Sequence, residues 1–311
     1  MTNIILFLST AFIWGTTWLA IKYQLGTVHP LWSVCYRFTL AGLILLAFCR
    51  LKGLNLKFSK KDHQWIALQA FLLFSLNYFF YYLGTDYFVS GIVAVIFAAV
   101  AIFNIFNARL FLKIPLSKSA IAGAIIGLSG LGVIFRTEIY RLIDQDTWTV
   151  LSGLSICLLG TLIASTGQIV ATANLKRALP YLQTNAIGMS YGGLYTALGA
   201  IVIGELPTFE LTAKYTLSLL YLTIAGTIIA FGLYMKLVKN IGPSKASYAF
   251  VLIPVVALTV STLFENFTWT IETMIGIGLV ILGNIVVMVS KTLQSRGKIE
   301  PHQEENLKKA A

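Results

Sequence analysis

Charged residues are scarce in this chain of 311 residues, since Asp, Glu, Lys and Arg make up only 11% of it. Apolar and aromatic residues make up 57%, and the mean hydropathy is +0.81. Soluble globular domains carry about 25% charged residues. The composition therefore excludes an ordinary soluble protein and indicates an integral membrane protein. The segments between the apolar runs are short, so we expect no attached soluble domain.

Cysteine and histidine are equally scarce, with three of each. Cys35, Cys49 and Cys157 all lie within apolar runs. An odd number of cysteines at these spacings predicts no disulfide framework and no metal site. We therefore expect neither a metal nor another cofactor.

The scarcity of histidines and carboxylates at membrane depth argues against the rival hypothesis, an intramembrane enzyme. Residues 127–130 read GLSG, as in the serine motif of rhomboid-type proteases. Such a serine needs a histidine base on a neighbouring helix, whereas every histidine lies in a loop or in the tail. Every aspartate lies at or beyond the end of an apolar run, which argues against aspartyl chemistry. A channel is also disfavoured, since no ring of like charges or carbonyl-filter motif occurs.

Long apolar runs, by contrast, recur along almost the whole sequence. About 18 or more apolar residues are needed to cross the hydrocarbon core as a helix. The first run has no basic segment before it and no small-residue cleavage site after it, so we expect it to be retained rather than removed as a signal peptide. Ten spans are predicted: residues 3–22, 31–49, 64–83, 88–108, 119–135, 149–173, 181–203, 215–235, 246–264 and 273–290.

The net charge of +11 would suit a nucleic-acid partner, but in a membrane protein Lys and Arg first report orientation. With ten spans, the side that holds both termini carries 18 of these residues and the other side carries four; the last one, Arg37, lies within the second span. This asymmetry predicts an even number of spans with both termini in the cytoplasm. The expected partner is the lipid bilayer rather than a nucleic acid.

The chain also repeats itself weakly. Residues 87–135 align with residues 240–288 at an offset of 153, and residues 41–43 align with 192–194 at an offset of 151. Five spans in each half would insert the second half in the opposite sense to the first. Such inverted repeats are typical of secondary transporters, whose substrate site lies near the midplane between the halves. We predict one repeat over residues 1–140, a second over 141–290, and a polar cytoplasmic tail over 291–311.

Three stretches in this order resemble a known family. Span one contains WGTTWLAIKY, span two contains YRFTLAGLILL, and the ninth span ends in LFENFTW before a glycine-spaced last helix. With ten spans in five-plus-five order, the chain resembles the EamA family of the drug/metabolite transporter superfamily. The resemblance implies export, less often uptake, of amino acids or related small metabolites across the bacterial cytoplasmic membrane.

The first half departs from the family pattern. The family usually has a proline in spans four and nine and a glycine-glutamate pair after each. The second half keeps Pro254 and Glu265, whereas the first half has Ala101 and Lys113 at those places. If those features help each half to bend, the first half must bend by another means.

Candidate substrate contacts come from spans one, three and six. Trp14 and Trp18 share a helix face in mid-span, so we expect them to line a cavity rather than to serve as interfacial tryptophans. Polar residues of span three and span six would face the same space, because an amide or hydroxyl turned to lipid without partners is costly. The alternatives are an interfacial tyrosine belt and interhelical hydrogen bonds. The predicted substrate-binding set is Trp14, Trp18, Asn77, Tyr78, Tyr81, Ser165 and Gln168.

Four charges are expected near the external side: Lys22, Arg37, Asp86 and Glu265. We predict a gate or external mouth at these residues. The simpler alternative is that Lys22 and Arg37 extend to the membrane surface and that one of them pairs with Asp86.

Glycines four residues apart allow close helix packing. Gly123 with Gly127, and Gly188 with Gly192, form two such pairs. We assign them to packing; a homodimer contact is the alternative.

Transport coupled to protons needs a titrating group where the substrate binds, but no Asp, Glu or His lies in the middle of any predicted span. Facilitated diffusion, or antiport that uses the outer carboxylates, fits better. A charged ligand would find no partner at the midplane, so the expected substrate is a neutral or zwitterionic metabolite that is partly apolar.

Overall fold

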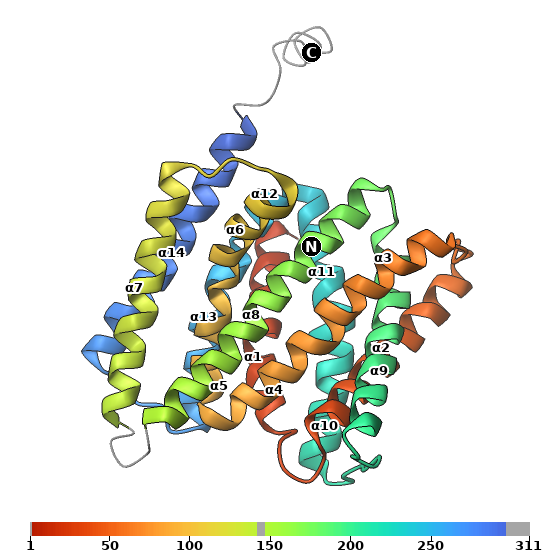
Figure 1. Ribbon diagram of the computed structural model, residues 1–311, viewed down its shortest axis with the longest axis horizontal. Coiled ribbons are helices and arrows are strands. Elements are labelled where there is room, and N and C mark those ends of the chain that lie inside the picture. Colours follow the sequence, from red (N-terminus) through yellow and green to blue (C-terminus); the bar gives the residue numbers. More distant parts are fainter. Residues whose placement is uncertain (1, 142–146, 297–311) are drawn as a thin grey trace, which may run out of the picture.

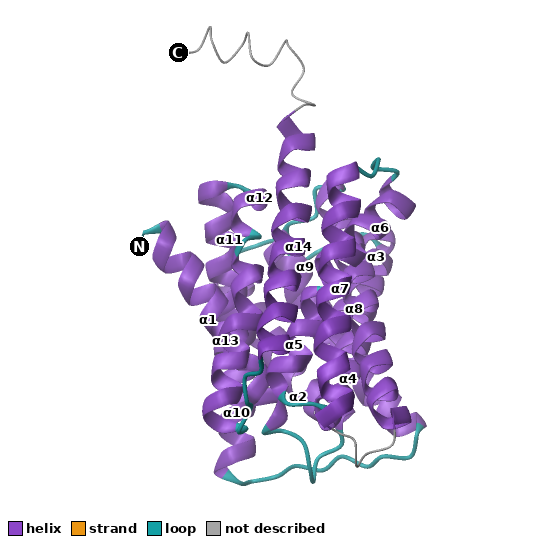
Figure 2. Ribbon diagram, turned by 90° about the vertical axis from the view of Figure 1, so that its left-hand side faces the viewer, coloured by secondary structure: helices purple, strands orange, loops and turns teal. Residues whose placement is uncertain are grey.

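The computed structural model describes residues 2–141 and 147–296, which form helices and loops with no strand among them (Figures 1 and 2). Residues 297–311, most of the predicted tail, lie outside the described residues. The helices are α1 (Asn3–Lys22), α2 (Pro30–Leu51), α3 (Lys60–Phe71), the π-helical turn η1 (Leu72–Leu76), α4 (Asn77–Tyr87), α5 (Ser90–Ala98), α6 (Val100–Leu112), α7 (Lys118–Arg141), α8 (Thr147–Lys176), α9 (Tyr181–Val202), α10 (Ala213–Thr223), the π-helical turn η2 (Ile224–Ile229), α11 (Ala230–Ile241), α12 (Pro243–Ala246), α13 (Ala249–Phe264) and α14 (Ile271–Arg296).

The prediction of an all-helical, multi-pass membrane protein is confirmed. Eight helical stretches are long and apolar enough to cross a membrane, and Ala249–Phe264 is a shorter apolar helix. The remaining predicted run falls on α9, which is 22 residues long but includes Gln183, Thr184 and Asn185 in its first turns. Eight of the ten predicted crossings are thus met by length and composition, and those at α9 and α13 remain predictions.

Two long helices contain a π-helical turn where an extra residue is accommodated. Helices α3 and α4 are joined through η1, and α10 and α11 are joined through η2. π-helical turns are rare and frequently lie at functional sites. Here η1 ends immediately before Asn77.

The first half interrupts its fourth predicted span without a proline. Helix α5 ends at Ala98 and α6 begins at Val100, with Ala99 (φ −62°, ψ −10°) between them. In the second half Pro254 lies inside α13. The first half thus has a one-residue interruption at Ala99, two residues before Ala101, which occupies the place of the family proline.

Helices α7 and α14 pack at one edge of the molecule and α2 and α9 at the other, with the remaining helices between them (Figure 1). A Cβ added to Gly42 of α2 would lie 2.7 Å from the Ser190 backbone nitrogen, and one added to Gly193 of α9 would lie 3.0 Å from that of Thr39. Small residues therefore set the distance between these two helices.

The four glycines predicted to serve packing all contact other helices of the chain. A Cβ on Gly123 would lie 2.8 Å from the Gly283 carbonyl oxygen, and one on Gly127 would lie 3.0 Å from the Ile102 side chain. Cβ atoms on Gly188 and Gly192 would lie 3.3 Å and 2.7 Å from Phe74 of η1.

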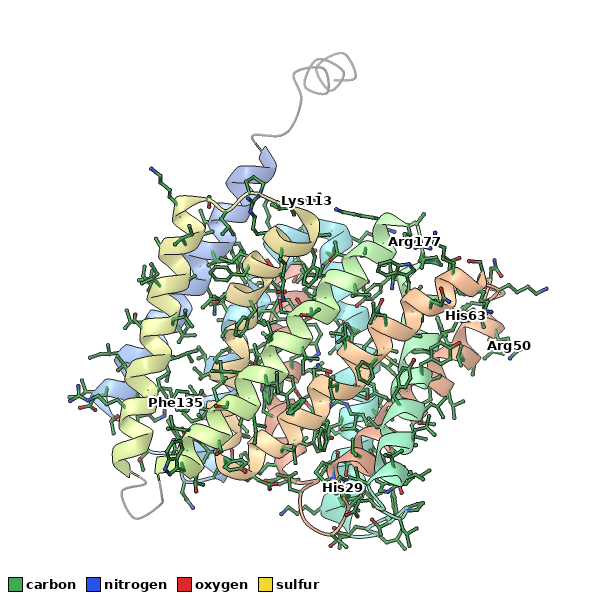
Figure 3. All side chains as sticks on the ribbon, in the orientation of Figure 1. His29, Arg50, His63, Lys113, Phe135 and Arg177 are labelled. Carbon is green, nitrogen blue, oxygen red and sulfur yellow. The ribbon has the colours of Figure 1, made fainter. Side chains whose placement is uncertain are left out.

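Basic residues gather towards one end of the helices. Lys113 and Arg177 lie towards the upper end in Figure 3 and Arg50 lies at its right-hand edge, whereas His29 lies at the lower end. Helix α1 starts and helix α14 ends on the upper side of Figure 2. We refer to these as the basic end and the opposite end.

Candidate functional site

A cavity of about 370 Å³ lies among the central helices, within the 300–1,000 Å³ typical of small-molecule sites. It takes residues from α1, α2, η1, α4, α5, α8, α9, α11 and α13. Its lining residues are Trp14, Thr17, Trp18, Ile21, Arg37, Leu73, Asn77, Tyr78, Tyr81, Phe97, Ala164, Gln168, Ala171, Thr172, Leu175, Tyr181, Phe231, Tyr234, Met235, Val238, Phe250 and Ile253.

The two tryptophans of α1 each contact a separate cluster of aromatic rings in the cavity wall. Trp18 meets Tyr81 edge-on, with ring centroids 5.3 Å apart, and lies 5.5 Å from Phe97. Tyr81 and Phe97 contact each other at 5.6 Å. Edge-on and offset arrangements of this kind are favourable beyond the apolar area they bury, so this part of the wall is well ordered by its own contacts.

Trp14 holds the second cluster, one turn away on the same face of α1. Its ring stacks on Phe250 at 5.3 Å and meets Phe231 edge-on at 5.4 Å. Tyr234 lies 5.4 Å from Trp14 and 5.2 Å from Phe250. The Trp14 indole nitrogen also donates to the Gly226 carbonyl in η2, at 3.2 Å.

Tyr234, Phe231 and Phe250 were not among the predicted site residues. An offset of 153 relates them to Tyr81, Tyr78 and Phe97, respectively. Of these pairs, Phe97 with Phe250 lies within the aligned segments 87–135 and 240–288, and the other two pairs would have required the alignment to be extended towards the N-terminus.

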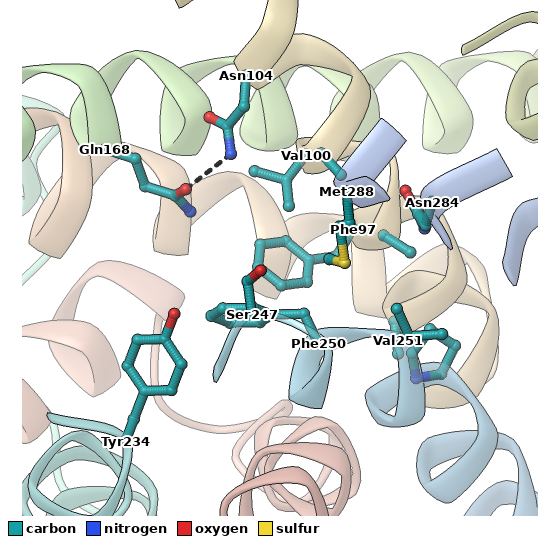
Figure 4. A pocket seen from close by; sticks show the side chains of 14 residues that line it. Phe97, Val100, Asn104, Gln168, Tyr234, Ser247, Phe250, Val251, Asn284 and Met288 are labelled. Atoms are coloured by element: carbon teal, nitrogen blue, oxygen red, sulfur yellow. Dashed lines mark hydrogen bonds between the residues drawn. The ribbon is translucent and has the colours of Figure 1, made fainter. Parts of the chain in front are cut away.

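A second cavity of about 290 Å³ adjoins the first and shares Phe97, Gln168, Tyr234 and Phe250 with it (Figure 4). Asn104 donates to the Gln168 side-chain oxygen at 2.9 Å, the bond drawn in Figure 4. Asn284 and Met288 of α14 also line this second cavity. Amide groups thus provide polar contacts between the aromatic walls.

Ser165 lies beside this space rather than in the lining of either cavity. Its hydroxyl donates to the Asn104 side-chain oxygen and accepts from Asn107, both at 2.8 Å. Through these bonds Ser165 connects α8 to α6 and orients Asn104 towards Gln168.

Two polar groups of the predicted set are buried without a hydrogen-bond partner: the Asn77 side-chain oxygen and the Tyr81 hydroxyl. Both residues line the larger cavity. Buried polar atoms are nearly always paired. Two unpaired groups at one cavity wall are therefore suited to meet a ligand or water.

Arg37 does not extend towards the surface. Its side chain is 2% exposed and lines the larger cavity. Its Nε donates to the Thr227 hydroxyl at 3.2 Å, and its guanidinium lies 4.7 Å from the centre of the Tyr78 ring. Among the described residues the ion pair is formed elsewhere, between Arg177 and Asp62, and Asp86 is exposed.

At the opposite end, polar contacts join the helices beyond the cavity. The Lys22 ammonium donates to the carbonyls of Thr85 at 2.5 Å and Phe88 at 3.4 Å. The Tyr82 hydroxyl donates to the Gln24 side-chain oxygen at 2.5 Å.

Glu265 makes a further connection at this end. It accepts hydrogen bonds from the Ser90 backbone nitrogen at 3.0 Å, from the Ser90 hydroxyl, and from the Ser261 hydroxyl at 2.6 Å. Its carboxylate thereby caps the start of α5 and joins α5 to the end of α13.

The cavity reaches towards the basic end. Its lining includes Leu175, which is 51% exposed in the last turn of α8, and Tyr181 at the start of α9. These two residues flank Arg177, which lies at the basic end in Figure 3. The lining of the cavity thus extends to the basic end.

Comparisons with known proteins agree with this architecture. The model of the EamA-like transporter family matches residues 1–136 and 151–289. The chain is 29% identical to the uncharacterised inner membrane transporter YedA of Escherichia coli strain K12, over 90% of this chain and 89% of YedA. It is 24% identical to the protein PagO of Salmonella typhimurium strain LT2, over 93% of each chain. An uncharacterised transporter of Archaeoglobus fulgidus is 25% identical over 92% of this chain and 98% of its own.

A solved crystal structure shares the fold, with a TM-score of 0.65 at 16% identity over 95% of this chain and 98% of the other. The predicted family resemblance and the predicted bacterial inner-membrane location are thus confirmed. The multi-pass helices, the match over both halves and the named relatives together identify this protein as a member of the EamA-like transporter family.

Proposed function

We propose that this protein is a secondary transporter that exports amino acids or related small neutral or zwitterionic metabolites. The observation that carries the proposal is the cavity of about 370 Å³, with aromatic walls and unpaired polar groups, whose lining extends to the basic end. An intramembrane enzyme is the alternative of another class, and an uptake permease is the alternative in direction. Against the enzyme, Ser129 of the GLSG stretch donates its hydroxyl to the Ile126 carbonyl of its own helix, at 2.8 Å.

Alternating access would come from two inverted repeats of five spans each, residues 1–140 and 141–290, followed by the tail 291–311. Two local features recur at or near the repeat offset and support this. The π-helical turns begin at Leu72 and Ile224, an offset of 152. Lys113, directly after α6, and Asn266, two residues after the end of α13, are related by an offset of 153 and have positive φ, 54° and 55°.

Contacts between the two halves also occur in pairs related by the repeat offset, as expected for two repeats related by a two-fold axis. Gly123 lies against Gly283, and Gly130 lies against Gly276. An offset of 153 converts one contact into the other. Ten crossings with both termini in the cytoplasm would place the basic end at the cytoplasmic face, where an exporter would collect its substrate.

The test of transport is flux. Proteoliposomes that contain the purified protein and are loaded with labelled amino acids should exchange at least one of them faster than protein-free liposomes do. Repeating the assay with and without a pH gradient separates facilitated from proton-coupled transport. If a broad panel of amino acids and nucleosides gives no protein-dependent flux, the metabolite proposal is wrong.

The direction of access makes a separate prediction. Thr172 is exposed and lines the cavity towards the basic end, so Thr172→Cys should react with a membrane-impermeant maleimide in inside-out vesicles. Thr161→Cys, on the same helix but buried, is the matched control and should not react. The three native cysteines are buried and contribute little background. Labelling of Thr172→Cys only from the outside would contradict the proposed orientation.

A further inference from the structure

Within residues 2–141 and 147–296, Arg37 is a buried cation without a carboxylate partner. Its Nε donates to the Thr227 hydroxyl at 3.2 Å, and the uncharged Tyr82 hydroxyl also lies beside the guanidinium. Its Nη1 is buried and has no hydrogen-bond partner. A buried charge left without an opposite charge costs several kcal/mol, and in a membrane protein such a residue points to function.

The surroundings of Arg37 hold the guanidinium by its faces. Its Cζ lies 4.7 Å from the centre of the Tyr78 ring and 5.2 Å from that of Phe38. Cation–π contacts of this kind use the flat surface of the group. They leave the edge of the guanidinium plane uncovered, where Nη1 has no hydrogen-bond partner. A planar fork of N–H donors matches the two oxygens of a carboxylate.

The cavity that Arg37 lines has no group to neutralise it. The described lining residues include one arginine and no Asp or Glu. The remaining polar groups, among them the Asn77 amide and the Tyr81 hydroxyl, are uncharged donors or acceptors. The interior of the site therefore carries one net positive charge and favours an anionic group.

A row of ring contacts connects this charge to the tryptophans of α1. Arg37 lies over Tyr78, Tyr78 lies 6.2 Å from Tyr81, and Tyr81 lies 5.3 Å from Trp18. A ligand with its anionic group at Arg37 would extend its apolar part along these rings.

We infer that the cavity binds organic carboxylates with an apolar or aromatic body, and that Arg37 binds the carboxylate. This rests on the proposed function and narrows its substrates to compounds that carry a carboxylate. The expectation of a substrate without net charge rested on the lack of a charged partner at the midplane. With Arg37 in the cavity wall, an anionic group has such a partner. An amino group on the ligand is accommodated but does not decide binding.

The experiment uses three probes with one side chain: L-phenylalanine, 3-phenylpropanoate, which lacks the amino group, and phenethylamine, which lacks the carboxylate. Binding to the full-length protein in detergent is measured by thermal stabilisation across a titration of each probe. L-leucine, 4-methylpentanoate and 3-methylbutylamine form a second series with an aliphatic body. The variants are Arg37→Gln, which removes the charge, and Arg37→Lys, which keeps the charge without the fork. Arg50→Gln, an exposed arginine of the same helix, is the matched control.

Both carboxylate-bearing members of at least one series should stabilise the wild-type protein and Arg50→Gln, and the amine should not. In Arg37→Gln the affinity for the carboxylates should fall about tenfold or more, as expected for the loss of a charged hydrogen-bonded pair, and Arg37→Lys should lie between. The melting temperature and elution profile without probe show whether each variant is folded. If Arg37→Gln does not fold, the comparison of Arg37→Lys with the wild-type protein and the preference for acids over amines decide.

Two results would overturn the inference: the amine binds as tightly as the amino acid, or the carboxylates bind wild-type protein and folded Arg37 variants with equal affinity. If the protein still transports the amino acid in either case, the proposed function stands. Absence of binding by every carboxylate, together with absence of flux for the whole amino-acid panel, would overturn both.

Discussion

Gly283→Val is expected to leave little folded protein in the membrane. A Cβ at position 283 would lie 2.5 Å from the Gly127 nitrogen, 2.6 Å from the Gly123 carbonyl oxygen and 2.7 Å from the Gly127 Cα. All three are backbone atoms, so no side chain can turn away to make room. The helices α7 and α14 would have to separate along their contact, which we expect to cost at least about 3 kcal/mol, the upper range for overpacking.

The matched control is Gly278→Val on the same helix. A Cβ there meets nothing within 4 Å, and Gly278 is exposed. Both variants are compared by the amount of monodisperse protein on size-exclusion chromatography and by melting temperature in detergent. Equal yields and melting temperatures for the two would show that the α7–α14 contact is not as close as described.

Trp14→Ala should lower substrate flux at least about tenfold while the protein still folds. The ring stacks on Phe250, meets Phe231 edge-on, and lines the cavity. Each aromatic contact is worth about 0.5–1.5 kcal/mol. Loss of the ring removes several such contacts from one wall of the site, so we expect the affinity for substrate to fall more than about tenfold. Trp14 is only partly buried, so the cost to folding should be smaller than at the buried Trp18.

Flux is measured in proteoliposomes that contain equal amounts of protein, with Phe12→Ala as the control. Phe12 lies on the same helix but is 59% exposed and does not line the cavity. Trp14→Phe keeps an aromatic ring but loses the 3.2 Å hydrogen bond to Gly226. It therefore separates the contribution of the ring contacts from that of the hydrogen bond. A folded Trp14→Ala protein with normal flux would remove Trp14 from the substrate site.

Two different sequence signals identified the predicted site residues. Helical spacing identified Trp14 and Trp18, because residues four apart must share a face. The cost of turning an amide to lipid identified Asn77 and Gln168. Neither signal distinguishes a residue that lines the cavity from one that lies beside it. For this reason Ser165 was predicted to bind substrate, whereas it forms hydrogen bonds with Asn104 and Asn107 beside the cavity.

Arg37 shows where the reasoning from sequence stopped. A position near the end of a span allows a long side chain either to reach the surface or to turn inwards, and the span alone does not distinguish them. The choice depends on Thr227 and Tyr78, which meet Arg37 from helices remote in sequence. Pairing of Asp86 with Lys22 or Arg37 was the simpler alternative. Lys22 interacts electrostatically with Asp86, while its ammonium donates hydrogen bonds to the backbone of Thr85 and Phe88.

The all-helical, membrane-spanning character of this chain could be predicted from its residues because the length and apolar character of a span follow from bilayer thickness. The family resemblance followed from the order of the motifs in spans one, two and nine. The three-dimensional packing was needed to establish which side chains share the cavity, and that its lining includes a buried arginine and no carboxylate among the described residues. These depend on how α1, α4, α8 and α11 pack together, and such contacts between distant segments are set by the side chains of all the helices at once.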